Sequence, residues 1–464
     1  IVMAKNYYLE SFRKFEILNH KERLSNLCAN IASLYLQSAN FSSAIEHYNR
    51  GMEYSGENVI SKILNLRGLG DVYSNLSNYS KSLNYYEEAK KLSLKIKDVS
   101  TESSIDVSLG TLYYNINKPI KALQVFLDVK NKLDLETEPY LAEDIYFKIG
   151  LAYSAIDSLD ESNKALVNAL SVAESVNDVY YKTIINTELG HNYILQKDYS
   201  KAETAITTAM QLSKSNGFNQ ILGLQNLYLG KIAFAKNNFG KAIEFFRIAS
   251  SLATNEMDYS NVLEAEYLLA KTYKAKNDIV KAEEHYLKAV TLADKISESL
   301  ISNSEIHISH FSGLDDCYNE LAEFYLEQNK NEEAFLIIEK SHSRNTLQNL
   351  TDLKINSIYH NKEKLDLFYD VKWLMNSGIL SGKEMFAITN QYENLKKEIY
   401  SVNPELQSAL EKSKQFSIKE IQKKLIASEN LITLFFGETN LYYINIRHDN
   451  SVVKKAGVSK EEMI

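Results

Sequence analysis

The feature that most constrains the fold of this chain is an internal repeat of about 40 residues. Each copy has a small residue, usually an aromatic residue three positions later, a second small residue twelve positions after the first, and a large residue four positions beyond that. The first small residue, here called the marker, is Ala32, Gly70, Gly110, Gly150, Gly190, Gly230, Ala270 and Ala322 in successive copies. The steps between markers are one of 38 residues, five of 40 and one of 52. A period this regular predicts a solenoid built from one repeated supersecondary unit.

The spacing within each copy predicts two antiparallel helices. Small residues let the two helix axes approach closely, and an aromatic residue one turn later lies on the same helical face and fills the space beside them. Turn-forming stretches such as "QKDYS" and "KNNFG" separate the two helices. The chain has only 3 prolines, which favours long helices. We interpret the frequent tyrosines as core residues rather than as a ligand-stacking surface, because their spacing is that of the packed face.

The pattern resembles the tetratricopeptide repeat (TPR) over roughly three quarters of the chain. The common repeat has about 34 residues, so we interpret the extra residues as longer helices. The expected fold is mostly α: a right-handed α-solenoid of about eight long helix pairs, a helical connector, and a short β segment that opens an α/β domain. The expected boundaries are 1–350 for the solenoid, with 1–18 as the second helix of an incomplete repeat, then 351–428 for the connector and 429–464 for the β segment.

The β segment begins abruptly after a long helical region. The runs "LITLFF", "LYYINIR" and "SVVKKAG" have the composition of strands, and the stretches Gly437–Asn440 and His448–Ser451 have the composition of turns. A meander this short cannot bury a core by itself. We therefore expect it to be the edge or opening of a larger domain.

Two short motifs frame this region. "EKSHSR" closes the repeat array with Glu339, Lys340, Ser341, Ser343 and Arg344, and "FFGETNLYYINI" carries Phe436, Gly437, Glu438, Leu441 and Tyr442. Their order after a repeat array resembles the CHAT family of caspase-like domains that follow TPR arrays. The resemblance implies an α/β peptidase domain whose catalytic histidine and cysteine lie on later strands, so no catalytic residue is expected within these 464 residues. It also implies a chain truncated before its catalytic part. The first residue is not methionine, and Ala4 and Tyr8 fit the repeat register, which agrees with a missing N-terminus.

Composition and scattered motifs weigh against several other classes of protein. The net charge is -8 without an extended basic block, so neither nucleic acid nor an anionic membrane is an expected partner. No apolar run approaches the length of a membrane span.

Cys28 and Cys317 are too few and too far apart for a disulfide framework, which favours a reducing, cytoplasmic and, we expect, bacterial setting. His307 and His310 have a spacing that could bind metal on a helix, but nothing completes a site, so we expect no metal and no cofactor.

The most promising candidate site is a groove lined by the first helix of each pair. Residues one turn around from the marker are expected to face it. They are Arg67, Asp71, Asn75, Thr111, Tyr114, His191, Ile194, Lys231, Phe234, Lys271 and Lys274. Three lysines on one strip could hold the carboxylates of an acidic peptide or protein partner that also has apolar anchors. The alternative is that the strip is only a solvated helix face.

Two classes of function remain open from the sequence. The leading hypothesis is the recognition and regulatory scaffold of a CHAT-type cysteine peptidase, which binds a protein partner in the groove. The alternative is a non-enzymatic TPR adaptor or sensor array of a signalling protein. An enzyme contained within these residues is the weakest hypothesis. The sequence does not identify the partner or the oligomeric state.

Overall fold

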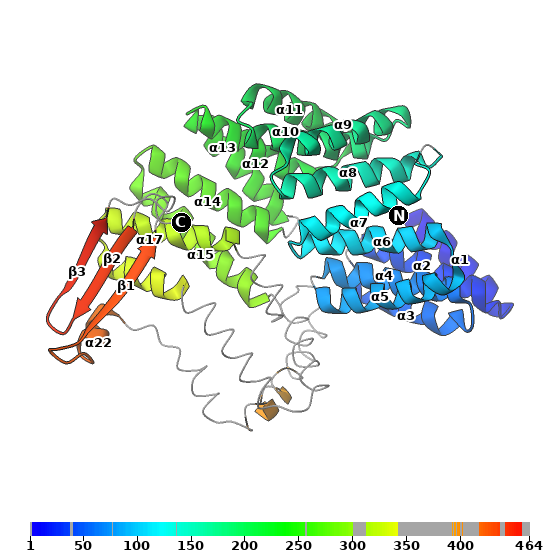
Figure 1. Cartoon of the computed structure of the whole chain (residues 1–464), viewed down its shortest axis with the longest axis horizontal. Helices are drawn as coiled ribbons and strands as arrows, with labels where there is room; N and C mark the ends of the chain where they lie inside the picture. Colours follow the sequence, from blue (N-terminus) through cyan, green and yellow to red (C-terminus); the bar gives the residue numbers. More distant parts are fainter. Residues whose placement is uncertain are drawn as a thin grey trace. The chain divides into compact units, whose positions relative to one another are not determined.

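A computed structural model describes residues 2–37, 40–76, 78–135, 137–255, 258–299, 312–341, a few positions between 392 and 401, and 417–436 and 441–456 (Figure 1). These residues divide into two compact units. Unit 1 comprises residues 1–236, and unit 2 comprises the described residues from 237 to 456. The predicted solenoid of long helix pairs, followed by a short sheet, is confirmed. Most of the predicted connector, together with His307, His310, Ser343, Arg344 and the turn 437–440, lies outside the described residues.

Unit 1 alternates the first and second helices of successive pairs. The helices are α1 (Val2–Ile17), α2 (Lys21–Gln37), α3 (Phe41–Ser55), α4 (Val59–Asn75), α5 (Tyr79–Ile96), α6 (Val99–Asn115), α7 (Pro119–Lys132), α8 (Pro139–Ala155), α9 (Leu159–Ser175), α10 (Val179–Leu195), α11 (Tyr199–Asn216) and α12 (Asn219–Ala235). Each first helix from α4 to α12 spans 17 residues. The residues beyond the common repeat length therefore lengthen the helices, as the sequence predicts.

The marker glycines set how closely the two helices of a pair approach. A Cβ atom built on Gly110 would lie 2.5 Å from Cε1 of Phe126, and one on Gly150 would lie 2.7 Å from Cγ of Leu166. Real side chains do not approach one another this closely, so an alanine at either position would require the pair to separate. The small residue and the large residue sixteen positions later are thus the contact that closes each helix pair.

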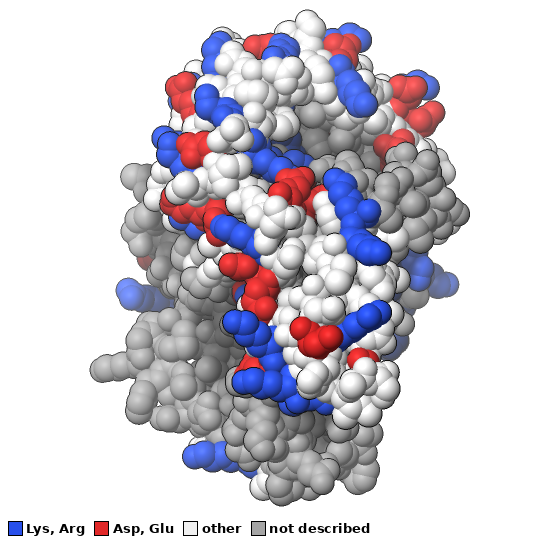
Figure 2. Space-filling view, turned by 90° about the vertical axis from the view of Figure 1, so that its left-hand side faces the viewer, with Lys and Arg blue, Asp and Glu red and all other residues white. Residues whose placement is uncertain are grey.

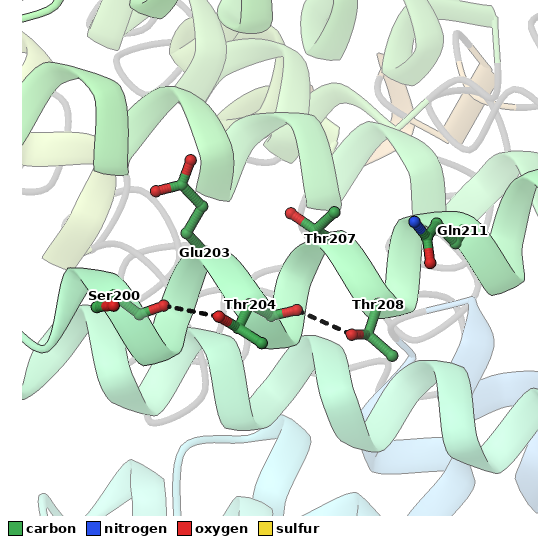
Figure 3. A pocket seen from close by; sticks show the side chains of 6 residues that line it. All are labelled: Ser200, Glu203, Thr204, Thr207, Thr208 and Gln211. Carbon is green, nitrogen blue, oxygen red and sulfur yellow. Dashed lines mark hydrogen bonds between the residues drawn. The ribbon is translucent and has the colours of Figure 1, made fainter.

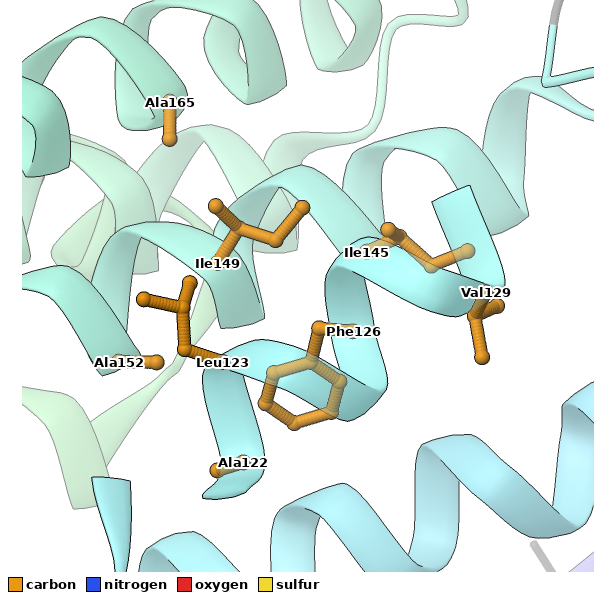
Figure 4. Packing of buried hydrophobic residues seen from close by; sticks show 8 residues of the cluster. All are labelled: Ala122, Leu123, Phe126, Val129, Ile145, Ile149, Ala152 and Ala165. Carbon is orange, nitrogen blue, oxygen red and sulfur yellow. The ribbon is translucent and has the colours of Figure 1, made fainter. Parts of the chain in front are cut away.

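The helix pairs share their apolar core with their neighbours along the chain. One such cluster contains Ala122, Leu123, Phe126, Val129, Ile145, Ile149, Ala152 and Ala165, which come from α7, α8 and α9 (Figure 4). Phe126 and Val129 are almost fully buried, although they belong to a helix whose opposite side is solvated. No pair buries its apolar face alone, which is the packing expected of a solenoid.

The turn within each pair depends on one residue in the left-handed backbone conformation. Asn117 (φ 55°), Asp157 (φ 60°) and Lys197 (φ 61°) occupy this position in three successive pairs. Asparagine and aspartate tolerate a positive φ better than other non-glycine residues, and lysine does so less well. The residue that follows often caps the next helix, as where Asp198 Oδ1 accepts from the backbone N–H of Lys201 at 3.1 Å.

The tyrosine three residues after the marker packs within its own helix pair. The ring of Tyr73 stacks on Tyr85 with centroids 5.5 Å apart, and the ring of Tyr35 stacks on His47 at 5.4 Å. The ammonium group of Lys81 lies 5.2 Å from the Tyr73 centroid. These contacts show that tyrosines at this position pack against the second helix of their own pair, as the sequence predicts.

Unit 2 combines helix pairs with a sheet. Its elements are α13 (Phe239–Asn255), α14 (Tyr259–Ala275), α15 (Ile279–Ser299), α17 (Ser312–Glu327), α22 (Ile418–Gln422), β1 (Asn430–Phe436), β2 (Leu441–Arg447) and β3 (Ser451–Ala456). The sheet has the order β1-β2-β3 and both pairings are antiparallel, with Phe436 opposite Leu441 and Ile446 opposite Ser451. The three predicted strands are therefore present.

The sheet packs against the last described repeat of unit 2. Phe435, Tyr442 and Ile444 are buried on its inner side. The Tyr442 hydroxyl donates to the buried carboxylate of Glu323 on α17 at 3.2 Å. The backbone N–H of Ile418 donates to Glu332 at 2.9 Å, at the start of α22. Repeat and sheet thus share one core within unit 2.

Candidate functional site

The candidate site is the face of the first helices that carries the residues two before, one after and four or five after each marker, here called the first-helix face. These side chains meet in a regular way. Ser108 Oγ lies 3.3 Å from Asp71 Oδ1, and the His191 ring stacks on Tyr228 at 4.9 Å with 1° between the ring planes. Both pairs join residues 37 apart in the sequence. The residue after one marker therefore contacts the residue two before the next marker, which links successive first helices.

At the N-terminal end of unit 1 the first-helix face is a tightly bonded polar network. Asp71 accepts from the Tyr86 hydroxyl at 2.7 Å, and Arg67 donates to Ser104. Burial raises the pKa of Asp71 despite these hydrogen bonds. Asn75 donates to the backbone oxygen of Asp71 at 2.9 Å. Asp71, which the sequence predicts to face a groove, accepts hydrogen bonds from α5 and α6 and so links both helices to α4.

Thr111, the next residue on the predicted strip, also bonds locally. Its hydroxyl donates to the backbone oxygen of Val107 at 2.9 Å, which is the usual bond of a threonine within a helix. The side chain of Thr111 is half-buried. This residue offers a methyl group and no spare donor to a partner.

Toward the C-terminal end of unit 1, side chains of α10 and α12 gather around Glu188 and Tyr228. His191 Nδ1 lies 3.8 Å from Glu188 Oε2, and the Lys231 ammonium lies 5.4 Å from the Tyr228 centroid. Burial, helped by the charge of Glu188, raises the pKa of Tyr114 to about 12, so its hydroxyl stays protonated. The cluster of Tyr114, Glu188, His191, Tyr228 and Lys231, here called the central cluster, therefore offers a carboxylate, an ammonium group, an imidazole and aromatic rings.

An apolar patch adjoins the central cluster along α10 and α12. Ile194 and Phe234 are half-buried, and 48% of Leu195 is exposed. These residues lie four or five positions after their markers, so they occupy the C-terminal turn of each first helix. The first-helix face thus changes along the helices from polar to apolar.

The two lysines expected to extend this strip, Lys271 and Lys274, belong to unit 2 and have carboxylate partners there. Lys271 Nζ lies 2.6 Å from Glu320 Oε1, and Lys274 Nζ lies 2.8 Å from Glu327 Oε2. Glu320 is buried and also accepts from the hydroxyls of Tyr267 and Tyr286, at 2.7 and 2.8 Å. Burial, together with the charge of Glu320, raises the pKa of Tyr286. Lys271, Tyr267, Tyr286 and Glu320 thus form one hydrogen-bonded group, here called the charged joint.

Sequence reasoning missed the acidic partners in unit 2. Glu320, Glu323 and Glu327 follow one another at intervals of three and four residues, which places them on one face of α17. Two of them pair with lysines of α14, and the third receives the hydroxyl of Tyr442. The spacing was a visible signal that this helix presents an acidic face.

Other surfaces of the described residues are weaker candidates for a binding site. Lys and Arg side chains are interspersed with Asp and Glu on the face seen in Figure 2. An open hollow on α11 is lined by Ser200, Glu203, Thr204, Thr207, Thr208 and Gln211 (Figure 3). There the hydroxyls of Thr204 and Thr208 donate to backbone oxygens of the same helix at 3.1 and 3.0 Å, so the hollow is only a solvated helix surface. The described residues contain no cluster of histidine, cysteine, aspartate and glutamate that could hold a metal ion, and none of their helices has the length and apolarity of a membrane span.

Comparisons with known proteins identify the repeat. The family model of the tetratricopeptide repeat matches residues 68–95 and 263–296. Human SH3 domain and tetratricopeptide repeat-containing protein 2 is 25% identical over 319 residues, which cover 62% of this chain. That alignment spans 23% of the human protein, so the chain corresponds to about a quarter of its length. The chain thus contains tetratricopeptide repeats.

Two solved structures illustrate the similarity of fold. A Signal Transduction ATPase with Numerous Domains that has a tetratricopeptide repeat sensor, from Pyrococcus horikoshii, is similar with a TM-score of 0.51 and 16% identity, covering 79% of this chain and 54% of that one. Aspartyl phosphate phosphatase F from Bacillus subtilis is similar with a TM-score of 0.49 and 12% identity, covering 73% and 92%. At these identities the similarity establishes the fold alone.

Proposed function

We propose that this chain is the recognition scaffold of a larger regulatory protein and that it binds a protein or peptide partner on the first-helix face of unit 1. The observation that carries the proposal is the central cluster, where Glu188, His191 and Lys231 lie beside an apolar patch. Charged groups would set the register of a partner, and the apolar patch would supply most of the affinity.

The partner that fits best is an acidic segment with aromatic or aliphatic anchors. Lys231 would attract its carboxylates, while Phe234 and Tyr114 would contact its apolar side chains. An exposed ion pair contributes only about 0.2–1 kcal/mol, so the apolar anchors are essential. Within unit 2, we propose that Lys271 and Lys274 also attract acidic side chains of a partner, which would compete there with Glu320 and Glu327.

Charge reversal at Lys231 tests this proposal. The probe is a fluorescent synthetic dodecapeptide in which Glu and Asp alternate with Phe and Leu, measured by anisotropy. Lys231→Glu is expected to weaken its binding about three- to tenfold and to flatten its salt dependence. The matched control is Lys214→Glu, an equal charge change on an exposed residue of α11. Equal affinities for the two variants, with unchanged melting curves, would exclude this part of the first-helix face as the binding site.

We also propose that the partner controls a CHAT-type caspase-like peptidase domain in a cytoplasmic protein, with the solenoid ending near residue 350 and the peptidase domain opening near residue 429. Support comes from the motif "FFGETNLYYINI" and from the antiparallel pairing of β1 with β2, as expected for opening strands. Reading the gene beyond Ile464 tests this proposal. A histidine–glycine motif and a later cysteine at the end of a strand are expected, and a stop codon or a different domain would overturn it.

The second candidate is a non-enzymatic adaptor or sensor array. The observation that favours it is the similarity to the signal transduction ATPase, whose tetratricopeptide repeats are described as a sensor. The same gene reading separates the two candidates, because an ATPase, a membrane anchor or a DNA-binding domain in place of the peptidase would favour a sensor array.

A further inference from the structure

A second surface of unit 1, outside the first-helix face, carries a periodic row of exposed apolar side chains. Ile60, Val99, Tyr140 and Tyr180 are 63%, 50%, 65% and 50% exposed. Each lies in the first turn of a first helix, in α4, α6, α8 and α10 respectively. Single exposed apolar residues are ordinary on protein surfaces, but here four lie in the first turns of successive first helices, with Ile60, Tyr140 and Tyr180 ten residues before their markers and Val99 eleven residues before its marker. We call this row the edge stripe.

Two contacts show how the N-terminal ends of successive first helices meet at this edge of unit 1. Asn58 Nδ2 donates to Glu22 Oε1 at 3.0 Å, and the rings of Tyr180 and Phe218 meet edge to face at 5.7 Å. In both contacts, the residue ten before one marker meets the residue twelve before the next marker. The same relation places Asp98 beside Ile60 and Asp178 beside Tyr140.

Negative charge therefore alternates with the apolar side chains along the edge stripe. Asp98 directly precedes Val99, Glu138 lies two residues before Tyr140, and Asp178 lies two residues before Tyr180. Lys62, Lys97 and Lys182 are cations close to the stripe in the sequence, and Lys182 is engaged with Asn177 Oδ1 at 2.8 Å.

A buried carboxyl adds to this negative potential. Glu143 of α8 is 1% exposed, and its Oε2 atom has no hydrogen-bond partner. Burial and the charges of Asp178 and Asp144 raise the pKa of Glu143 to about 7. A cation brought close to this end of α8 would relieve that repulsion.

The spacing of the edge stripe selects one kind of partner. Neighbouring helices in proteins pack about 8–10 Å apart, so apolar side chains on successive first helices are expected to be separated by about this distance. A helix rises about 1.5 Å per residue, so residues seven apart lie on one face and about 10.5 Å from one another. A strand alternates its faces with a period of two and does not match this distance on a single face. We propose that the edge stripe binds a basic amphipathic helix of a partner protein, with an apolar residue at every seventh position and Lys or Arg beside each.

The test uses two fluorescein-labelled synthetic 28-residue helices with leucine at every seventh position. One carries flanking lysines, and in the other every lysine is replaced by glutamate. The full chain is expected to bind the lysine peptide at least tenfold more tightly than the glutamate peptide, and less tightly as salt rises. The double variant Tyr140→Ser and Tyr180→Ser is expected to lose at least tenfold in affinity. The matched control is Leu94→Ser and Val167→Ser, which are 54% and 51% exposed on second helices and should not change binding.

Three outcomes would overturn the proposal. The first is equal affinity for the two peptides. The second is unchanged binding by the folded tyrosine double variant. The third is a dimer of the full chain that this variant abolishes, because the stripe would then bind a second copy. If the double variant does not fold, Glu138→Lys provides the alternative test, since Glu138 makes no capping hydrogen bond. It should weaken binding of the lysine peptide severalfold, and unchanged binding would contradict the proposal.

Discussion

The two units join successive first helices by different kinds of contact. In unit 1, the linking pairs are a hydroxyl with a carboxylate, Ser108 with Asp71, and an imidazole with a phenol ring, His191 with Tyr228. In unit 2, the equivalent position holds Lys271 and buried Glu320, and two tyrosine hydroxyls complete the site. The markers of unit 2 are alanines, whereas those of unit 1 are glycines except for Ala32. The same repeat geometry thus accommodates a weak contact between successive first helices in unit 1 and a buried ion pair in unit 2. Disrupting the two kinds of contact should therefore have different effects on stability.

The largest expected effect is on the charged joint of unit 2. Glu320→Ala removes the acceptor of Lys271, Tyr267 and Tyr286, and leaves a partly buried cation and two buried hydroxyls without their partner. Loss of one member of a buried pair costs about 3–5 kcal/mol, and we expect about 3 kcal/mol here because Lys271 retains some access to water. Denaturant unfolding measures the change, and hydrogen exchange should localise it to α14, α15 and α17. A loss below about 1 kcal/mol would show that the charged joint is no stronger than the neutral ones.

The next effect concerns how closely the two helices of a pair, α8 and α9, pack in unit 1. Gly150→Ala places a methyl group against Leu166, and we expect a loss of about 1–3 kcal/mol through overpacking. The matched change is Gly240→Ala in α13, where the nearest atom to the new Cβ is 4.0 Å away. That substitution should raise stability by up to about 1 kcal/mol, because alanine loses less backbone entropy. Opposite signs in thermal melting would support the closure mechanism, and two destabilised variants would contradict it.

A pH-dependent effect should appear in unit 1. The pKa of Glu143 is raised to about 7 in the folded chain from 4.5 in the unfolded one, so the stability it contributes is complete below pH 4.5 and is lost as the pH rises through 7. Glu143→Gln should therefore gain about 1–2 kcal/mol relative to the parent at pH 8 and almost nothing at pH 4.5. Glu161→Gln, an exposed carboxylate on α9, is the control. Parallel stability curves from pH 4.5 to 8 for Glu143→Gln and its parent would exclude the effect.

The smallest expected effect separates the two lysines of unit 2. Lys274 and Glu327 are 34% and 41% exposed, so this pair contributes only about 0.2–1 kcal/mol. Lys274→Met should change the denaturation midpoint slightly and reduce its dependence on salt. A double-mutant cycle with Glu327→Gln measures the pair directly, and a coupling as large as that of Lys271 with Glu320 would show that exposure does not distinguish the two.

Most of the fold could be predicted from the sequence, because one period fixes which residues share a helical face. The markers, the large partners sixteen residues later and the strands near residues 430–456 are where the pattern places them. The pairing across helices was harder to predict. Asp71 was expected to face a groove because the period shows the direction of a side chain but not what the next helix presents to it.

The missed pairing in unit 2 has an arithmetic cause. Linked residues of regular repeats are 37 apart, as with His191 and Tyr228, whereas Lys271 and Glu320 are 49 apart. The difference of 12 equals the excess of the last step, 52 residues, over the usual 40. The same rule therefore operates in unit 2, but the insertion conceals it from a search at a fixed period. Whether the first-helix face binds a partner stays a prediction, since helix geometry does not reveal the occupant.

The hydrogen bond between Tyr442 and Glu323 has a consequence for the order in which the chain acquires its structure. It joins residues 119 apart, whereas Ser108 and Asp71 are 37 apart and Tyr267 and Glu320 are 53 apart. Contacts between near neighbours in sequence form early and fast, and distant ones must wait for more of the chain. During synthesis, the helix pairs can assemble one after another as they leave the ribosome. The sheet docks only after α17 is in place, so the buried Glu323 must remain without its tyrosine partner until more than a hundred further residues have been translated.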